Sequence, residues 1–182
     1  AVSRIWLGPD QITDHVTRIL EPATVAINRA RMAAAAPAEL LSVGTLPEHP
    51  RCSLVVPLYG RLDFMMYQLA LASEFDTGVD EYVYVLDEPA RRQEFLALAR
   101  SVFQRFGLPL RLVMPADNLG FAGASNAGLA AARGEFVCFL NSDVMPNRVD
   151  WVGMLVRAVR DDLSIGLIGA RLLFEDGTLQ HG

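Results

Sequence analysis

After about residue 50, short apolar runs alternate along the chain with longer segments of helical character. The apolar runs cover 53–58, 82–87, 110–114 and 135–140, and helices are expected over 62–75, 89–106, 123–133 and 150–161. Apolar strands that alternate with helices form a parallel sheet that is covered on both faces. The pattern therefore predicts an α/β fold with a mostly parallel sheet and flanking helices. A hairpin is expected near the end, with its turn at Asp176-Gly177.

Residues 1–50 have a different character and are rich in alanine. Residues 11–35 show loosely helical spacing, which Pro22 is expected to divide into two short helices. Residues 37–50 hold three prolines and a glycine and are expected to form a linker. We therefore expect a helical extension with a Pro-rich linker over 1–50 and an α/β domain over 51–182. The extension could pack on that domain or dock another one.

Composition excludes several classes of protein. With 52% hydrophobic and 20% charged residues, the chain can bury a core and is not disordered throughout. A net charge of −5 and a pI near 5.2 argue against nucleic-acid binding, which needs a basic face. Cys52 and Cys138 are expected to be reduced core residues rather than a disulfide or a zinc site.

Location follows from similar arguments. The sequence contains neither an apolar run of about 18 residues, which a membrane span needs, nor the pattern of a signal peptide at its start. A cytoplasmic location is expected, with attachment to a membrane through other parts or partners left open.

In a parallel sheet, ligands bind beyond the carboxyl ends of the strands, so the residues that follow the strands carry the chemistry. Asn141-Ser142-Asp143 follows the run 135–140. A carboxylate there suits Mg²⁺ or Mn²⁺, which take oxygen ligands and are often shared with phosphates. The alternative is a turn or helix cap, a role for which Asp150 stands closer to the next helix.

Three other loops follow strands. The loop 118–128 is rich in glycine and leads into a helix, which suits either an anion site or tight helix packing. Asp87 could accept hydrogen bonds from a base or ribose, or form a turn. Tyr59 could stack on a base and Arg61 could meet a phosphate, or both could be surface residues.

Four segments occur in a specific order: SLVVPLYGR, YVLD, NLGFAGASNAGLAAARGEFVCFLNSD and IGARLLFEDGTLQHG. This ordered set resembles the nucleotide-sugar-binding half of family-2 glycosyltransferases with the GT-A fold, including rhamnosyltransferase-like members, over about residues 51–182. The resemblance implies a GT-A, Rossmann-like sheet that is truncated here.

The same resemblance implies a nucleotide-sugar site in the loops after the strands. Its residues would be Pro57, Tyr59, Arg61, Asp87, Asn118, Gly120, Asn126 and Asn141. Asp143 matches the last carboxylate of a D-x-D motif, which binds Mg²⁺ or Mn²⁺, although Asn141 replaces the first acid. His181 resembles a histidine of related enzymes and is a candidate metal ligand or a surface residue. The catalytic base is expected beyond Gly182.

The implied activity is transfer of a sugar from a UDP- or dTDP-sugar to a saccharide or glycolipid acceptor, inverting and metal-dependent, in polysaccharide biosynthesis. The chain would supply the donor-binding half and further domains the rest. The arginine-rich, lysine-free composition favours a bacterial source.

Two alternatives stay open. One is a non-catalytic nucleotide-binding or interaction module. The other is a Rossmann-type dinucleotide or S-adenosylmethionine enzyme, because Gly120 and Asp143 are separated by close to the spacing of about 20 residues typical of that fold. The missing G-x-G-x-x-G motif argues against this second alternative.

Overall fold

The computed structural model describes residues 8–34 and 36–181. The chain divides into two compact units, 1–36 and 37–182. The division falls earlier than the expected boundary at residue 50. Whether the two units act as separate domains stays a prediction.

The first unit is a continuous helical segment: α1 (Pro9–His15), the π-helical turn η1 (Val16–Leu20) and α2 (Glu21–Ala34). The expected break at Pro22 is wrong, because this proline stands in the first turn of α2, directly after the π-helical turn. The hydrogen-bond pattern already changes at that turn, from i→i+4 to i→i+5. The missing N–H of Pro22 therefore falls where the helix is irregular and does not break it. The large apolar side chains of this unit from Ile12 to Ile27 are at least 41% exposed.

The second unit is built on a five-stranded sheet with strand order β1-β4-β3-β2-β5. Its strands are β1 (Glu39–Val43), β2 (Cys52–Leu58), β3 (Glu81–Leu86), β4 (Leu110–Met114) and β5 (Phe136–Phe139). β2, β3, β4 and β5 pair in parallel, as expected, whereas β1 runs antiparallel to β4 at the edge. The sequence predicts a linker over 37–50. The first part of this prediction is wrong, because Glu39–Val43 form β1 and extend the sheet.

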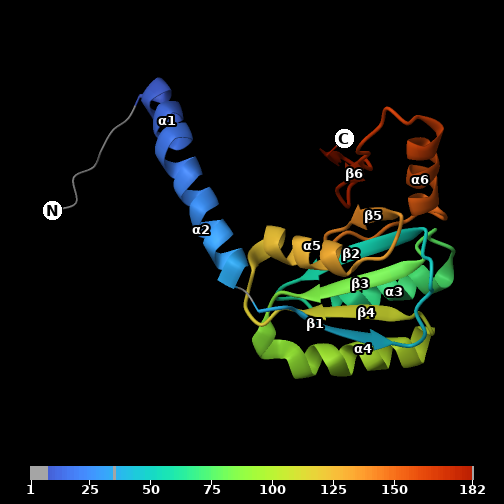
Figure 1. Ribbon diagram of the computed structural model, residues 1–182. Coiled ribbons are helices and arrows are strands. Elements are labelled where there is room, and N and C mark those ends of the chain that lie inside the picture. The colour runs from blue at the N-terminus through green and yellow to red at the C-terminus, as the bar shows by residue number, and fades with distance from the viewer. Residues whose placement is uncertain (1–7, 35, 182) are drawn as a thin grey trace. The chain divides into compact units, whose positions relative to one another are not determined.

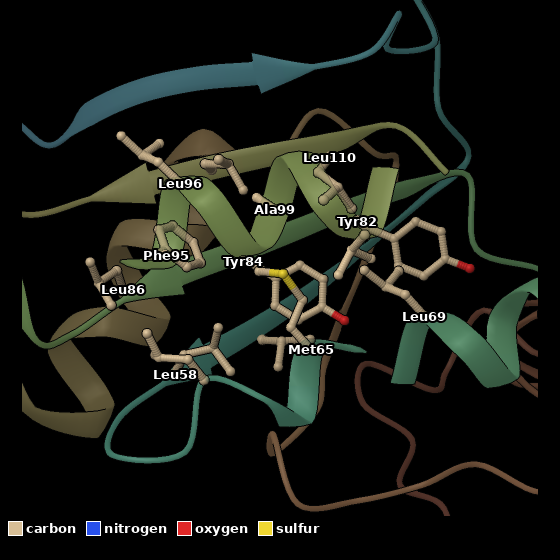
Figure 2. Close-up of a cluster of buried hydrophobic side chains, with 14 of the residues drawn as sticks. Leu58, Met65, Leu69, Tyr82, Tyr84, Leu86, Phe95, Leu96, Ala99 and Leu110 are labelled. Carbon is tan, nitrogen blue, oxygen red and sulfur yellow. The ribbon is translucent and has the colours of Figure 1, made fainter. Parts of the chain in front are cut away.

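The sheet is buried on both faces, which explains why its central strands lack polar alternation. On one face, residues such as Leu54, Tyr84 and Leu112 pack with α3 (Phe64–Glu74) and α4 (Arg92–Phe106). Figure 2 shows this cluster, with Met65 and Phe95 contributed by the two helices. On the other face, valines of β2, β3 and β4 pack against α5 (Gly120–Ala131), which lies across the sheet in Figure 1.

Two of the expected helices are followed by a glycine, and the two glycines have different roles. α4, which follows the short 3-10 turn η2 (Pro89–Arg91), ends at Phe106 and is capped by Gly107, whose φ of 71° is the left-handed conformation that glycine favours. The helix expected over 123–133 ends earlier, at Ala131, and Gly134 lies beyond it. A Cβ on it would lie 2.5 Å from the main-chain nitrogen of Ser53, so glycine allows the turn to approach β2.

Asp150 stands at the N-cap of α6 (Trp151–Asp161), as expected, but its side chain forms no cap hydrogen bond. The carboxylate instead pairs with Arg157 at 2.7 Å. The expected hairpin is present: β6 (Leu172–Leu173) and β7 (Leu179–His181) pair antiparallel around a turn with Gly177 at φ 82°. None of the described helices is both long and apolar enough to cross a bilayer.

Candidate functional site

A pocket of about 450 Å³ lies where β2, β3 and β5 end, at the carboxyl edge of the sheet. Eight of the ten predicted site residues line it: Pro57, Tyr59, Arg61, Asp87, Asn118, Gly120, Asn141 and Asp143. Phe64, Phe121 and Ser142 complete the lining. The segments that carry these residues are far apart in the sequence and meet because parallel strands bring their carboxyl ends to one edge.

The two other predicted site residues do not line this pocket. Asn126 is exposed in the second half of α5, beyond the helix start that borders the pocket. His181 belongs to β7, and its side chain lies outside the described part of the structure. Their roles in ligand binding therefore stay predictions without support from the geometry.

Asp87 is 3% exposed and connects β3 to the loop that precedes α5. The main-chain nitrogen of Leu119 donates to its Oδ1 at 2.6 Å. The Nδ2 of Asn118 donates to the main-chain oxygen of Asp87 at 2.5 Å and to its Oδ2 at 3.2 Å. Asp87 and Asn118 thus fix each other, and each carboxylate oxygen keeps capacity for a further donor from a ligand.

The loop after β2 presents Tyr59 and Arg61 to the pocket, and Tyr59 is 67% exposed. Glu88 and Arg91 form a charged pair that holds the main chain of Gly60 on both sides. The main-chain nitrogen of Gly60 donates to Oε2 of Glu88 at 3.1 Å, and Arg91 donates to its main-chain oxygen. The φ of Gly60 is 72°, a conformation that glycine adopts without strain.

Arg61 is already paired within this loop. Its guanidinium donates to both carboxylate oxygens of Asp63, at 2.8 and 2.6 Å, and lies 4.6 Å from the ring centre of Phe64. The hydrogen bonds to Asp63 raise the pKa of Arg61 and lower that of Asp63. Because the pair is exposed, an incoming phosphate can compete for the guanidinium at low cost.

Asn141, Ser142 and Asp143 follow β5 in a tight turn, which Val144 N closes by donating to Asn141 O at 3.2 Å. Asn141 and Asp143 are exposed toward the pocket. Gln68, a buried side chain of α3, contacts the main chain of this turn. Its Nε2 donates to the main-chain oxygens of Asn141 at 3.1 Å and of Val144 at 3.0 Å.

The residues of this turn carry the oxygen atoms that a metal ion such as Mg²⁺ or Mn²⁺ requires. Asp143 supplies a carboxylate, and Ser142 and Asn141 add neutral oxygens. Within the described residues, no three His, Cys, Asp or Glu side chains gather closely enough to enclose a metal ion. The turn therefore fits Mg²⁺ or Mn²⁺ only if ligand phosphates and water complete the shell, which is a common arrangement for Mg²⁺.

Three residues at or below the pocket were not among the predicted ones. Phe121 is 65% exposed inside the glycine-rich loop, and an apolar side chain between glycines was the available signal. Phe64 begins α3, shortly after the predicted residue Arg61. Gln68 stands alone as an amide among apolar residues of α3, a pattern that indicates a buried partner but not its identity.

Comparisons with protein families and with known proteins identify similarity to glycosyltransferases or to proteins of polysaccharide biosynthesis. The family model Glycosyl transferase family 2 matches residues 53–181. The amylovoran biosynthesis glycosyltransferase AmsB of Erwinia amylovora is 32% identical over 92 residues, which are 50% of this chain and 30% of that protein. The O-antigen biosynthesis protein RfbC of Myxococcus xanthus is 28% identical over 134 residues, which are 72% of this chain and 10% of that protein.

Among solved structures, the mannosyltransferase PcManGT from Pyrobaculum calidifontis, in complex with GDP-Man and Mn²⁺, superposes with a TM-score of 0.52. The two are 23% identical, and the match covers 81% of this chain and 42% of that one, so it bears on the fold alone. The chain thus spans less than a third of each curated relative named above. The predicted GT-A fold and the predicted family are confirmed: the chain belongs to family 2 of the glycosyltransferases.

Proposed function

We propose that this chain binds the nucleotide-sugar donor of a polysaccharide glycosyltransferase in the pocket at the carboxyl edge of its sheet. One observation carries the proposal. The lining of this pocket combines exposed aromatic side chains, an arginine and a carboxylate turn, which come from the loop after β2, the start of α5 and the turn after β5. A base, a phosphate and a metal ion are the groups that these three features suit.

The residues divide the donor between them. Tyr59 and Phe121 are the large exposed aromatic side chains of the lining and suit the flat face of a base. Arg61 would exchange its exposed pairing with Asp63 for the diphosphate. Asp143 would hold Mg²⁺ or Mn²⁺, and the ion when bound would stabilise the negative charge of the departing diphosphate.

The reaction proposed for the whole protein is inverting transfer to a saccharide or glycolipid acceptor. The acceptor hydroxyl forms a bond to the anomeric carbon as the bond from that carbon to the diphosphate oxygen breaks. A carboxylate base would take the hydroxyl proton. None of the residues that line the pocket is assigned to this proton transfer. The donor would be a UDP- or dTDP-sugar.

Calorimetric titration tests the proposal. UDP, dTDP, GDP and NAD are each titrated with and without Mn²⁺ into the wild type, Asp143→Ala and a control, Asp161→Ala. Asp161 is an exposed carboxylate at the end of α6 and lies outside the pocket.

We expect Mn²⁺ to strengthen the binding of one pyrimidine diphosphate to the wild type and the control. We expect that gain to be lost in Asp143→Ala. Tight NAD binding without a metal would instead support the dinucleotide alternative. The absence of any Mn²⁺-dependent nucleotide binding to the wild type would refute the proposal.

A further inference from the structure

We propose that Gln68 is a positioning residue: it holds the turn Asn141–Val144 in the shape that lets Asp143 share a metal ion with the donor. This inference deepens the proposed function and rests on it. Gln68 itself does not line the pocket and belongs to α3, on the sheet face opposite α5.

The amide of Gln68 is almost fully used. The side chain is 6% exposed, and the two hydrogens of its Nε2 are donated to the main-chain oxygens of Asn141 and Val144, the first and last residues of the turn. The hydroxyl of Tyr84 donates to its Oε1 at 3.1 Å. Since main-chain oxygens can only accept, the nitrogen of the amide must face the turn, and the orientation of the amide is determined.

Tyr84 fixes the other end of this connection. It lies in the middle of β3 and is fully buried, and Figure 2 shows its hydroxyl within the apolar cluster near Met65. Burial raises the pKa of Tyr84 well above its usual value, so the hydroxyl keeps its proton and remains a donor. A hydrogen-bonded chain therefore runs from the centre of the sheet through Gln68 to the turn.

The turn needs such support because it has little of its own. One main-chain hydrogen bond, from Val144 N to Asn141 O at 3.2 Å, closes it, and Asn141 and Asp143 are exposed. Metal sites depend on outer residues that fix the ligands, and a change of such a residue typically weakens metal binding roughly 10- to 100-fold. Gln68 is a buried side chain with contacts at both ends of this turn.

The test compares Gln68→Met, which keeps the length of the side chain without its donors, with Tyr84→Phe, which removes only the orienting hydroxyl. Two controls separate positioning from general destabilisation. Gln104→Leu changes an exposed amide of α4, and Val102→Ala weakens the same apolar cluster away from the turn.

Two measurements are made on each variant. Calorimetry gives the affinities for UDP and dTDP with and without Mn²⁺, and their ratio for the nucleotide that the wild type binds is the Mn²⁺ gain. Hydrogen exchange reports the protection of the Val144 amide in the absence of any ligand, so it does not depend on nucleotide binding.

For Gln68→Met we expect the Mn²⁺ gain to fall roughly 10-fold or more, with metal-free binding changed less than about 2-fold. The Val144 amide should exchange faster. Tyr84→Phe should show the same pattern to a smaller extent, and both controls should keep the gain. If Gln68→Met does not fold, Tyr84→Phe decides the question in the same way.

The inference is overturned if the Gln68 and Tyr84 variants keep the wild-type gain, or if Val102→Ala loses it equally. A wild type without any Mn²⁺ gain is a different result. It refutes the proposed function, and this inference with it, whereas a wild-type gain that survives in the variants refutes the inference alone.

Discussion

Replacing Glu81 with glutamine is expected to destabilise the second unit more than any exposed charge change would. Glu81 begins β3, at the end of the sheet opposite the pocket, and is fully buried. It accepts hydrogen bonds from Ser53 Oγ at 2.5 Å, from the main-chain nitrogen of Arg133 at 2.9 Å and from Nε of Arg111 at 2.8 Å. These contacts join β2, β4 and the turn after α5 at one carboxylate.

The size of this destabilisation follows from the burial of the ion pair between Glu81 and Arg111. The side chain of Arg111 is 6% exposed, and its Nη2 lies 2.7 Å from Oε1 of Glu81 without an aligned hydrogen bond in the described structure. Glu81→Gln leaves this buried guanidinium without a counter-charge, and removing one partner of a buried pair costs about 3–5 kcal/mol. A domain of ordinary stability has only about 5–15 kcal/mol in total.

Urea unfolding followed by circular dichroism measures the effect. With a slope of roughly 2 kcal/mol per M, a loss of about 4 kcal/mol lowers the midpoint by about 2 M. Glu39→Gln is the matched control, since it breaks an exposed pair with Arg92 and should cost about 0–1 kcal/mol. The double variant Glu81→Gln/Arg111→Met should recover most of the loss. A loss below about 1 kcal/mol in the single variant would refute the reasoning.

The effect should also depend on pH. Burial alone would raise the pKa of Glu81, but the hydrogen bonds from Ser53, Arg133 and Arg111 outweigh burial and lower it. A carboxylate with a lowered pKa in the folded state stabilises the fold above its unfolded pKa, near 4.5, and loses that contribution as the pH falls. The difference between the wild type and Glu81→Gln should therefore be constant near neutral pH and shrink in acid.

Two further predictions concern packing and thiol chemistry. Gly128→Ala should cost about 1–3 kcal/mol in urea unfolding, because the added Cβ would overlap Cγ1 of Val55, whereas Gly166→Ala, which meets open space, should be near neutral. Equal effects would contradict the close packing of α5. Burial raises the pKa of Cys52 to about 12 and that of Cys138 to about 11, so at pH 8 a thiol reagent should label both far faster in urea than in buffer. Rapid labelling of Cys52 in buffer would contradict its burial, whereas Cys138 is half-buried.

The candidate site could be predicted largely from local signals. Asp87 and Asn141-Ser142-Asp143 directly follow apolar strands, and the rule that ligands bind at the carboxyl ends of parallel strands was enough to group them. Asn126 was included because it belongs to the same motif as Asn118. In α5, the helical rotation turns it to an exposed position away from the pocket.

The first fifty residues show why local signals fail elsewhere. Proline and glycine around 37–50 indicate a linker, but β1 forms because the open edge of β4 offers main-chain hydrogen bonds to a nearby segment. That edge exists only after the sheet has formed, so composition cannot reveal it. Gly134 is similar, since only the approach of the turn to Ser53 explains its need for glycine.

What the sequence determined by itself is the order of elements after residue 50, the parallel sheet and the family, because these depend on periodicity and on motifs that are read along the chain. What only the tertiary structure decided is which side chains support the motifs. Gln68 lies 73 residues from Asn141 in sequence, yet contacts it directly. Such contacts depend on how α3 packs on its face of the sheet, and a linear pattern contains no information about which buried amide contacts which turn.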